Sequence, residues 1–185
     1  MKNRTLWIVM AVLAIVLIAG VSMYNGMIST NEAIDSKWSQ VENQLQRRSD
    51  LIPNLVATTK GYAAQEREIF TQVAEARSKL AGANTVGEKA QADAELSDAL
   101  SRLLVVVERY PELKSDANFR QLADELAGTE NRLTVARKDY NDAVQAYNTR
   151  IKRFPSNMVA NMAGFTAREY FKAAEGTQEV PQVQF

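Results

Sequence analysis

The sequence predicts an all-α protein: an N-terminal transmembrane helix, an antiparallel up-and-down four-helix bundle and a short C-terminal amphipathic helix. Three observations support this fold class. A long apolar run lies near the N-terminus, apolar residues then recur every three or four positions, and no short β-branched runs alternate with turn signals. We divide the 185 residues into a cytoplasmic N-terminus (1–5), a transmembrane helix (6–24), the bundle (25–154), the amphipathic helix (155–174) and an irregular tail (175–185).

The apolar run covers residues 6–23, and Ser22 is its only polar member. At about 1.5 Å per residue it reaches about 27 Å, enough to cross the hydrocarbon core of a bilayer. Trp7 and Tyr24 flank it at the positions where aromatic belts lie. A cleavable signal peptide is the alternative. Its apolar region would be long, and Val21 is too bulky for a good cleavage site, so we expect a retained anchor.

The charges beside the run predict its orientation. Lys2 and Arg4 precede it without any acid, whereas residues 24–44 carry Lys37 against Glu32, Asp35 and Glu42. The positive-inside rule therefore places the N-terminus in the cytoplasm and the bulk of the chain outside. In a Gram-negative cell this means a single-pass protein of the inner membrane whose bundle lies in the periplasm.

The first bundle helix is predicted to restart after the anchor. Asn25-Gly26 suggests a break, and Ser29-x-x-Glu32 has the pattern of a capping box. Pro53 removes one backbone donor and predicts a kink, and Gly61 is a candidate stop. Apolar spacing that alternates four and three predicts a coiled-coil-like seam, with the positions Ile34, Trp38, Val41, Leu45, Arg48, Ile52, Leu55, Thr59 and Tyr62.

Three further helices complete the predicted bundle, and short links make neighbours antiparallel. The second has its stripe at Ile69, Val73, Ala76 and Leu80. The third begins at a capping box, Thr85-x-x-Glu88, ends at Tyr110-Pro111, and has its stripe at Leu96, Leu100, Leu103 and Val107. The fourth runs from about Ser115 to Pro155 and has its stripe at Phe119, Leu122, Leu126, Thr129, Leu133, Ala136, Tyr140, Val144, Tyr147, Ile151 and Phe154.

The final segment, residues 156–174, combines a polar face with a broad apolar surface that includes Met158, Met162, Phe165, Tyr170 and Phe171. This surface has three possible fates: capping its own bundle, meeting another protomer, or lying in the membrane interface. Arg168 and Lys172 would suit the interface, but Glu169 and Glu175 offset their charge. We therefore expect a protein contact.

Composition excludes most catalytic chemistry. The chain has no cysteine and no histidine, so thiolate catalysis, Ser-His-Asp hydrolysis and histidine-ligated metal sites are excluded. Lys+Arg and Asp+Glu both number 22, so no global charge points to nucleic acid. A carboxylate-only or lysine-based active site remains possible. Glu66, Glu130 and Asp139 could converge, but such acids are more often ion-pair partners. We expect a non-enzymatic protein without a metal or cofactor.

Arg48 occupies a seam position, and Arg47 lies beside it. A buried guanidinium must be paired, because removing one partner of a buried pair costs about 3–5 kcal/mol. Glu130, Asp139 and Asp50 are the candidate partners. One interpretation is a polar lock that sets helix register. The other is a recognition surface around Pro53, where a free backbone carbonyl and Asn54 would face a partner.

Tyr-Asn pairs recur one heptad apart on the fourth helix, at Tyr140-Asn141 and Tyr147-Asn148. Tyrosines at seam spacing are more often core residues with a satisfied hydroxyl than ligand contacts. Asn141 and Asn148 would flank the seam as a hydrogen-bonding ladder, either internal or facing another protomer.

Four stretches resemble the LemA family: "WSQVENQLQRRSDLIPNLVATTKGYAAQE", "YPELKSDANFRQL", "ARKDYNDAVQAYNTRIKRFP" and "VPQVQF". The resemblance implies a bacterial protein with one membrane helix and a four-helix-bundle body. Many members carry histidine where this chain has Gln65. The hallmark positions fall on Arg47, Arg48, Asp50, Leu51, Pro53, Asn54, Leu55, Gly61, Tyr62, Glu66, Tyr140, Asn141, Tyr147, Asn148 and Pro155.

The resemblance implies no settled biochemical activity. Some family members are encoded beside membrane metallopeptidases or other envelope proteins, which suggests a partner role. We therefore expect a membrane-anchored envelope scaffold or adaptor that self-associates, holds a membrane partner, or both. The alternative is a sensor or ligand-binding bundle with a pocket near the Pro53 kink, among Arg48, Tyr62 and Tyr140. An anionic-ligand pocket would favour the sensor, and a large homo-oligomeric interface would favour the scaffold.

Overall fold

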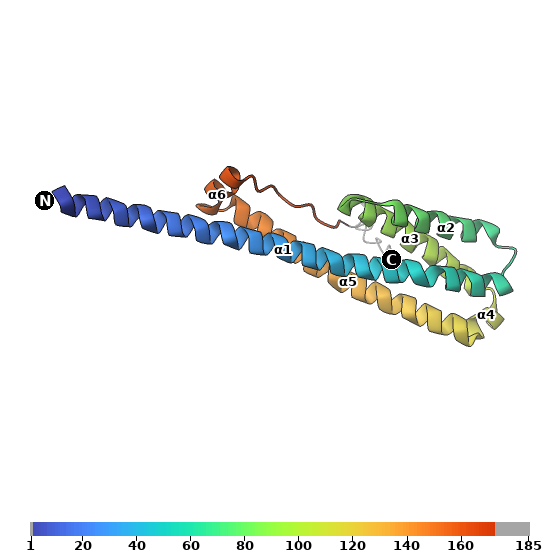
Figure 1. The fold of residues 1–185 in the computed structure, drawn as a ribbon. Helices are drawn as coiled ribbons and strands as arrows, with labels where there is room; N and C mark the ends of the chain where they lie inside the picture. Colours follow the sequence, from blue (N-terminus) through green and yellow to red (C-terminus); the bar gives the residue numbers. More distant parts are fainter. Residues whose placement is uncertain (1, 173–185) are drawn as a thin grey trace, which may run out of the picture. The chain divides into compact units, whose positions relative to one another are not determined.

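The computed structural model describes residues 2–172, with side chains from residue 4 onward. Over this range the chain is all-helical and contains no strand (Figure 1). The helices of the described range are α1 (Lys2–Tyr62), α2 (Arg67–Gly82), α3 (Val86–Val107), α4 (Pro111–Ser115), α5 (Ala117–Lys152) and α6 (Ser156–Ala163).

The chain divides into two compact units, and α1 and α5 contribute to both. Unit 1 contains Met1–Ser39 and Asp139–Glu169, and unit 2 contains Gln40–Lys138 and Tyr170–Phe185. Unit 1 therefore holds the N-terminal part of α1, the C-terminal part of α5, and α6. Unit 2 holds the rest of α1 and α5 together with α2, α3 and α4.

The N-terminal part of α1 is long and apolar enough to cross a membrane, and its apolar window is not buried against the rest of the chain that the structure describes. The predicted break at Asn25-Gly26 is wrong, because α1 continues through it to Tyr62. Ser29 and Glu32 lie inside the helix, so they form no N-terminal cap. Met27 and Ile34 are fully buried, and their packing outweighs the cost of one helical glycine, about 1 kcal/mol.

Pro53 also lies inside α1, and its side chain is exposed. Seven of the nine predicted seam positions are buried: Ile34, Val41, Leu45, Arg48, Ile52, Leu55 and Thr59. The other two are less enclosed. Trp38 is half-buried with its ring 5.2 Å from that of Tyr140, and Tyr62 is 41% exposed.

The predicted capping box of α3 is confirmed. The Glu88 N–H donates to Thr85 Oγ1 (3.1 Å), and the Thr85 N–H donates to Glu88 Oε2 (3.0 Å). The short helix α4 was not predicted. It begins at Pro111, whose fixed φ suits the first position of a helix and whose missing N–H is not needed there.

Helix α6 is much shorter than the predicted helix over residues 155–174. It ends at Ala163, where Gly164 adopts a left-handed conformation (φ 76°) and the Phe165 N–H donates to Ala160 O (3.0 Å). Glycine favours this helix end because it has no Cβ to clash. Residues 165–172 then run without helical structure. Residues 173–174 and the predicted irregular tail, 175–185, lie outside the described residues.

Each unit has its own buried core. In unit 1 the buried apolar residues include Met27, Ile34, Tyr140, Val144, Tyr147, Ile151 and Ala160. In unit 2 they include Val41, Ile52, Leu55, Phe70, Val73, Leu96, Leu103, Leu113 and Leu133. Helices α2 and α3 run antiparallel, since Lys79 pairs with Glu95 (2.7 Å) and Arg102 donates to Gln72 (3.4 Å).

Candidate functional site

Two polar clusters gather the unusual residues of the sequence, one in each unit. We call the first the charge cluster; it consists of Arg48, Asp93, Ser97, Glu130 and Arg137 in unit 2. We call the second the Tyr-Asn clamp; it consists of Tyr140, Tyr147 and Asn148 in unit 1.

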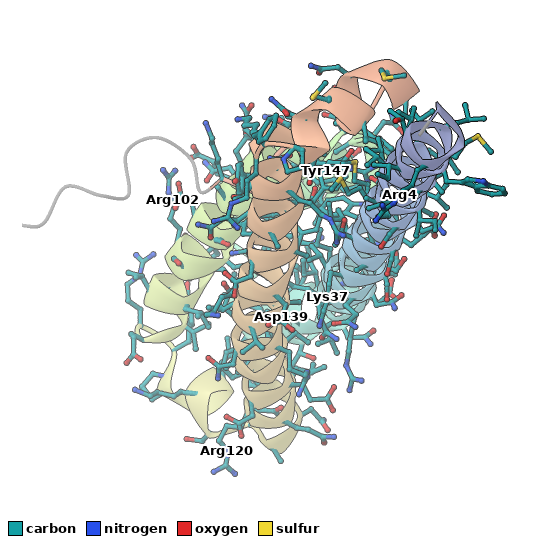
Figure 2. All side chains as sticks on the ribbon, turned by 90° about the vertical axis from the view of Figure 1, so that its left-hand side faces the viewer. Arg4, Lys37, Arg102, Arg120, Asp139 and Tyr147 are labelled. Atoms are coloured by element: carbon teal, nitrogen blue, oxygen red, sulfur yellow. The ribbon has the colours of Figure 1, made fainter. Side chains whose placement is uncertain are left out.

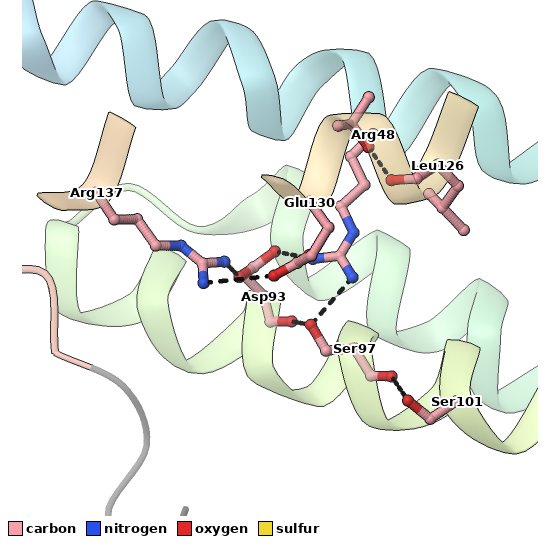
Figure 3. A network of polar contacts seen from close by, with 8 residues as sticks. Arg48, Asp93, Ser97, Ser101, Leu126, Glu130 and Arg137 are labelled. Atoms are coloured by element: carbon pink, nitrogen blue, oxygen red, sulfur yellow. Dashed lines mark hydrogen bonds and ion pairs between the residues drawn. The ribbon is translucent and has the colours of Figure 1, made fainter. Parts of the chain in front are cut away.

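Arg48 lies at the centre of the charge cluster (Figure 3). Its Nη1 lies 2.8 Å from Asp93 Oδ1 and 2.8 Å from Glu130 Oε2, and its Nη2 donates to Ser97 Oγ (3.1 Å). The contact with Glu130 is an ion pair whose angles fall outside hydrogen-bond geometry. Only 5% of the Arg48 side chain and 3% of the Asp93 side chain are exposed. Three helices, α1, α3 and α5, therefore meet at one buried guanidinium.

Arg137 is the second cation of the cluster. It donates to Asp93 Oδ2, its Nη1 lies 3.8 Å from Glu130 Oε1, and its guanidinium lies 5.0 Å from the centre of the Phe171 ring. Two arginines thus face two carboxylates, and the formal charges cancel. Such balance is required because an unpaired buried charge is strongly destabilising.

Burial lowers the pKa of both arginines. For Arg48 the charge of Glu130 acts in the opposite direction. For Arg137 burial, followed by the positive charge of Arg48, lowers the pKa to about 10. With a pKa of about 10, the Arg137 guanidinium remains charged at neutral pH.

The Tyr-Asn clamp holds a stretch of the chain by its backbone. The Tyr140 hydroxyl donates to Glu169 O (2.8 Å), and the Tyr147 hydroxyl donates to Thr166 O (3.1 Å). Asn148 bonds Arg168 twice: its Nδ2 donates to Arg168 O and its Oδ1 accepts from the Arg168 N–H, both at 2.9 Å. Burial raises the pKa of both tyrosines, which keeps their hydroxyls protonated as donors.

Among the described residues, the hydrogen bonds of Tyr140, Tyr147 and Asn148 to this stretch go to main-chain atoms, so they depend little on its side chains. A separate ion pair between Asp35 of α1 and the Arg168 guanidinium adds a side-chain contact. The clamp explains why the chain stops being helical after Gly164. The carbonyl groups of Thr166, Arg168 and Glu169 and the N–H of Arg168 find partners on α5, so these groups do not need a helix of their own.

The family's hallmark residues on α1 include both buried and exposed side chains. Arg48 points into unit 2, whereas Arg47, Asp50, Pro53 and Asn54 are exposed. Asp50 accepts a hydrogen bond from Gln46 on the same helix (2.8 Å). Arg47 also lines a groove of about 630 Å³ together with Ala117, Arg120, Gln121, Asp124, Glu125, Gly128 and Arg132.

The acids singled out in the sequence each have a different partner. Glu66 accepts from the Tyr110 hydroxyl (3.3 Å) and lies 3.1 Å from Arg109 Nη2. Glu130 belongs to the charge cluster. Asp139 pairs with Lys37 (2.9 Å), which it faces in Figure 2. Among the described residues, no group of three or more His, Cys, Asp or Glu is placed to hold a metal ion.

Sequence reasoning named Glu130 as a candidate partner of Arg48 but missed Asp93, Ser97 and Arg137. A signal for Asp93 existed. It lies three residues before Leu96, so it continues the seam of α3 and is an acid where an apolar residue is expected. Arg137 lies next to Ala136 of the α5 stripe, and nothing in the local pattern distinguishes it from a surface arginine.

Comparison with known proteins gives curated relatives in Paramagnetospirillum, Magnetospirillum and Metamycoplasma species. "Magnetosome protein MamQ 2" of Paramagnetospirillum magneticum is 33% identical over 176 residues, covering 80% of this chain and 64% of that protein. "Magnetosome protein MamQ" of Magnetospirillum gryphiswaldense is 29% identical over 174 residues with the same coverage. "Protein LemA" of Metamycoplasma hominis is 23% identical over 163 residues, covering 84% of this chain and 74% of that protein.

The chain thus spans 64% of the length of the two MamQ proteins. The family model described as "LemA family" matches residues 37–185, which include both polar clusters and exclude the apolar N-terminal run. With most of the sequence matched by this model, the chain belongs to the LemA family.

Proposed function

We propose that this protein is a membrane-anchored, non-enzymatic scaffold or adaptor of the cell envelope, which self-associates and holds a membrane partner. The N-terminal part of α1 crosses the inner membrane with the N-terminus in the cytoplasm, and the remainder lies in the periplasm. The exposed apolar surface of residues 6–18 supports the anchor, because a water-soluble helix buries such a face.

One observation carries the adaptor proposal: the family motif on α1 is split between two directions. Arg48 is buried and paired inside the charge cluster, whereas Arg47, Asp50 and Asn54 face solvent. These three residues follow the spacing i, i+3 and i+7, so they share one face of α1. An outward polar stripe beside Pro53 is the surface that a partner would contact.

The groove beside Arg47 fits a protein partner. It combines the cations Arg120 and Arg132 with the anions Asp124 and Glu125, so its charge is mixed. Mixed charge selects a complementary protein surface and offers little to nucleic acid. The partner class that the family resemblance suggests is a membrane metallopeptidase or another envelope protein.

We also propose that four helical segments of unit 2 form an antiparallel up-and-down bundle: residues 40–62 of α1, α2, α3, and residues 117–138 of α5. Polar contacts support this arrangement. Arg77 of α2 donates to Ser49 O of α1 (2.9 Å), Lys89 of α3 pairs with Glu42 of α1 (2.9 Å), and Arg48 joins α1 to α3 and α5.

In-cell crosslinking tests the adaptor proposal. A photo-activatable amino acid replaces Asn54 in the full chain, and a matched variant carries it at Ser101, an exposed position of α3 outside the motif. Crosslinked membranes are then separated and identified by mass spectrometry. We expect a discrete membrane-protein adduct from position 54 that is lost when Arg47→Ala and Asp50→Ala are added. Equal adducts from both positions, or none from position 54, would overturn the proposal.

A sensor is the second candidate, but Arg48, Tyr62 and Tyr140, the residues expected around its pocket, each have a partner within their own unit. Arg48 is held by the charge cluster, Tyr62 donates to Asp116 (3.2 Å), and Tyr140 donates to Glu169 O. A different groove, of about 680 Å³, could hold a ligand and favours the sensor hypothesis. Its lining includes Lys60, Arg67, Phe70 and Glu75, with Lys60 Nζ 5.4 Å from the centre of the Phe70 ring.

Two cations beside an aromatic ring suit a small anion with an apolar part. To test this candidate, the melting temperature of the full chain in detergent is measured at increasing concentrations of benzoate and, separately, of inorganic phosphate. A saturable rise that Lys60→Ala and Arg67→Ala abolish would support the sensor. Unchanged melting temperatures with both probes would count against it.

A further inference from the structure

Unit 1 exposes a compact group of large apolar side chains around α6. Phe154 is 76% exposed, Met158 is 58% exposed and Met162 is 89% exposed. Met158 and Met162 are four residues apart, so they lie on one face of the helix, and Phe154 precedes it by two residues. Grouped exposed apolar side chains indicate a contact with a protein or a membrane.

Helix α6 differs from an ordinary surface helix in charge. Its eight residues, Ser156–Ala163, contain no Asp, Glu, Lys or Arg. Because the helix ends at Ala163, Glu169 is not part of it. The charges nearest to it along the chain are cations, Lys152 and Arg153 before it and Arg168 after it.

Contacts inside unit 1 place α6 beside the end of the apolar run. The Phe165 ring, two residues beyond α6, lies 5.7 Å from the ring of Tyr24, the first residue after the run. Gly26, two residues further, leaves room for Arg150 of α5, since a side chain at Gly26 would overlap its guanidinium. Figure 1 shows α6 alongside this part of α1.

We propose that α6 is a second membrane contact, lying at the surface of the bilayer that the N-terminal helix crosses. This inference rests on the proposed anchor. If residues 6–23 occupy the hydrocarbon core, Tyr24 lies at the headgroup level, and its contact with Phe165 brings α6 to the same level. Phe154, Met158 and Met162 then insert at the boundary between headgroups and acyl chains, as the apolar faces of interfacial helices do.

The occupant is therefore a lipid surface with anionic headgroups. Lys152 and Arg153 are exposed and directly precede Phe154, where they are close enough to reach lipid phosphates. A protein partner would also cover an apolar face, but the nearness of α6 to the end of the anchor favours the bilayer. Two contacts with the membrane would fix the rotation of unit 1 about the axis of its anchor.

Single-cysteine labelling tests the proposal on the full chain, because the natural sequence contains no cysteine. An environment-sensitive fluorophore is attached at Met162→Cys, at Val16→Cys in the apolar run, and at Ser36→Cys, which is exposed on α1 twelve residues after Tyr24. Each protein is reconstituted into phosphatidylglycerol-containing vesicles that carry spin-labelled lipids with the quencher either near the headgroup or near the end of the acyl chain.

We expect the label at position 162 to be quenched by the headgroup-proximal lipid more than by the acyl-terminal lipid, position 16 to show the reverse, and position 36 to show neither. Lack of quenching at position 16 would refute the anchor itself. Quenching at position 16 with none at position 162 would refute the α6 contact alone. Disulfide-linked dimers of Met162→Cys, formed without lipid quenching, would assign the face to a second copy of the chain and overturn the proposal.

Discussion

At the residue scale, Arg48 illustrates how a charged side chain is kept inside a helical core. Its guanidinium is shared by Asp93, Glu130 and Ser97, which lie on α3 and α5. The partners offset a desolvation cost of several kcal/mol. Arg47, the preceding residue, is exposed, so two adjacent residues of the same type have opposite environments.

We expect Arg48→Ala to destabilise the protein by about 3 kcal/mol, because it leaves Glu130 and the buried Asp93 with fewer counter-charges. For a chain of this size the melting temperature should fall by about 6–12 °C. Arg47→Ala should cost no more than about 0.5 kcal/mol. Circular dichroism of the full chain in detergent measures both. The full chain is used because a shortened chain beginning at Ser29 would lack the buried Met27. Equal, small effects would show that Arg48 is not a buried lock.

The Tyr-Asn clamp also depends on a single residue. Asn148→Ala removes both bonds to the Arg168 backbone, so the Arg168 amide should lose most of its hydrogen-exchange protection while the helices retain theirs. Asn148→Asp keeps the acceptor and should give an intermediate loss. Thr149→Ala, at the exposed neighbouring position, serves as the control. Unchanged exchange at the Arg168 amide in Asn148→Ala would mean that the clamp does not hold this segment.

At the scale of elements, the start of α3 is set by its capping box. Thr85 accepts from the Glu88 N–H, and Glu88 accepts from the N–H groups of Asn84 (2.8 Å) and Thr85. These bonds, Asn84 first, lower the pKa of Glu88 below its usual value of 4.5. The cap therefore ties the stability of α3 to pH.

The sign follows from the lowered pKa. The stabilisation from ionised Glu88 is fully present above the pKa of the unfolded chain and is lost as the pH falls through the lower pKa of the folded chain. Thr85→Ala should cost about 1 kcal/mol at neutral pH. Glu88→Gln should destabilise at pH 7 and make little difference once the wild-type carboxyl is protonated. Unfolding curves across this pH range measure it; a constant difference at all pH values would exclude the ionised cap.

At the scale of the whole molecule, the orientation of the anchor decides where the protein works. Lys2 and Arg4 precede the apolar run, and acids outnumber Lys37 after it, which favours a cytoplasmic N-terminus. A reporter enzyme that is active only in the periplasm should therefore be active when fused after Phe185. Activity of a cytoplasmic reporter at the same position, with a silent periplasmic one, would reverse the proposed topology.

Self-association is the second property at this scale. The anchor lacks a G-x-x-x-G motif, so it should pair only weakly by itself, and the rest of the chain must contribute. Light scattering of the full chain in mild detergent should give a protein mass several times that of one chain. If the mass shows an oligomer, serine substitutions at three exposed apolar residues outside unit 1 should locate the contact. These residues are Leu104, Val105 and Val135. A monomer at micromolar concentration would contradict the scaffold proposal and favour the sensor.

The sequence alone determined the features that depend on short-range patterns. Hydropathy located the apolar run, the seven-residue spacing located most buried positions of α1 and α5, and the Thr85 box located the start of α3. These signals are local because a helix satisfies its own backbone and exposes a periodic face. The same locality produced the false break at Asn25-Gly26, where packing of Met27 and Ile34 overrides a weak helix-breaking signal.

Only the tertiary structure decided which distant groups meet. Three acids were plausible partners of Arg48 from spacing, yet Asp93, a fourth, shares the guanidinium with Glu130, while Asp139 pairs with Lys37. Gly164 ends α6 locally, but the path of the residues that follow was not a local matter, because Tyr140, Tyr147 and Asn148 on α5 supply their hydrogen bonds. Helical periodicity specifies the face on which a residue lies, whereas pairing across helices depends on three-dimensional positions that the local pattern does not contain.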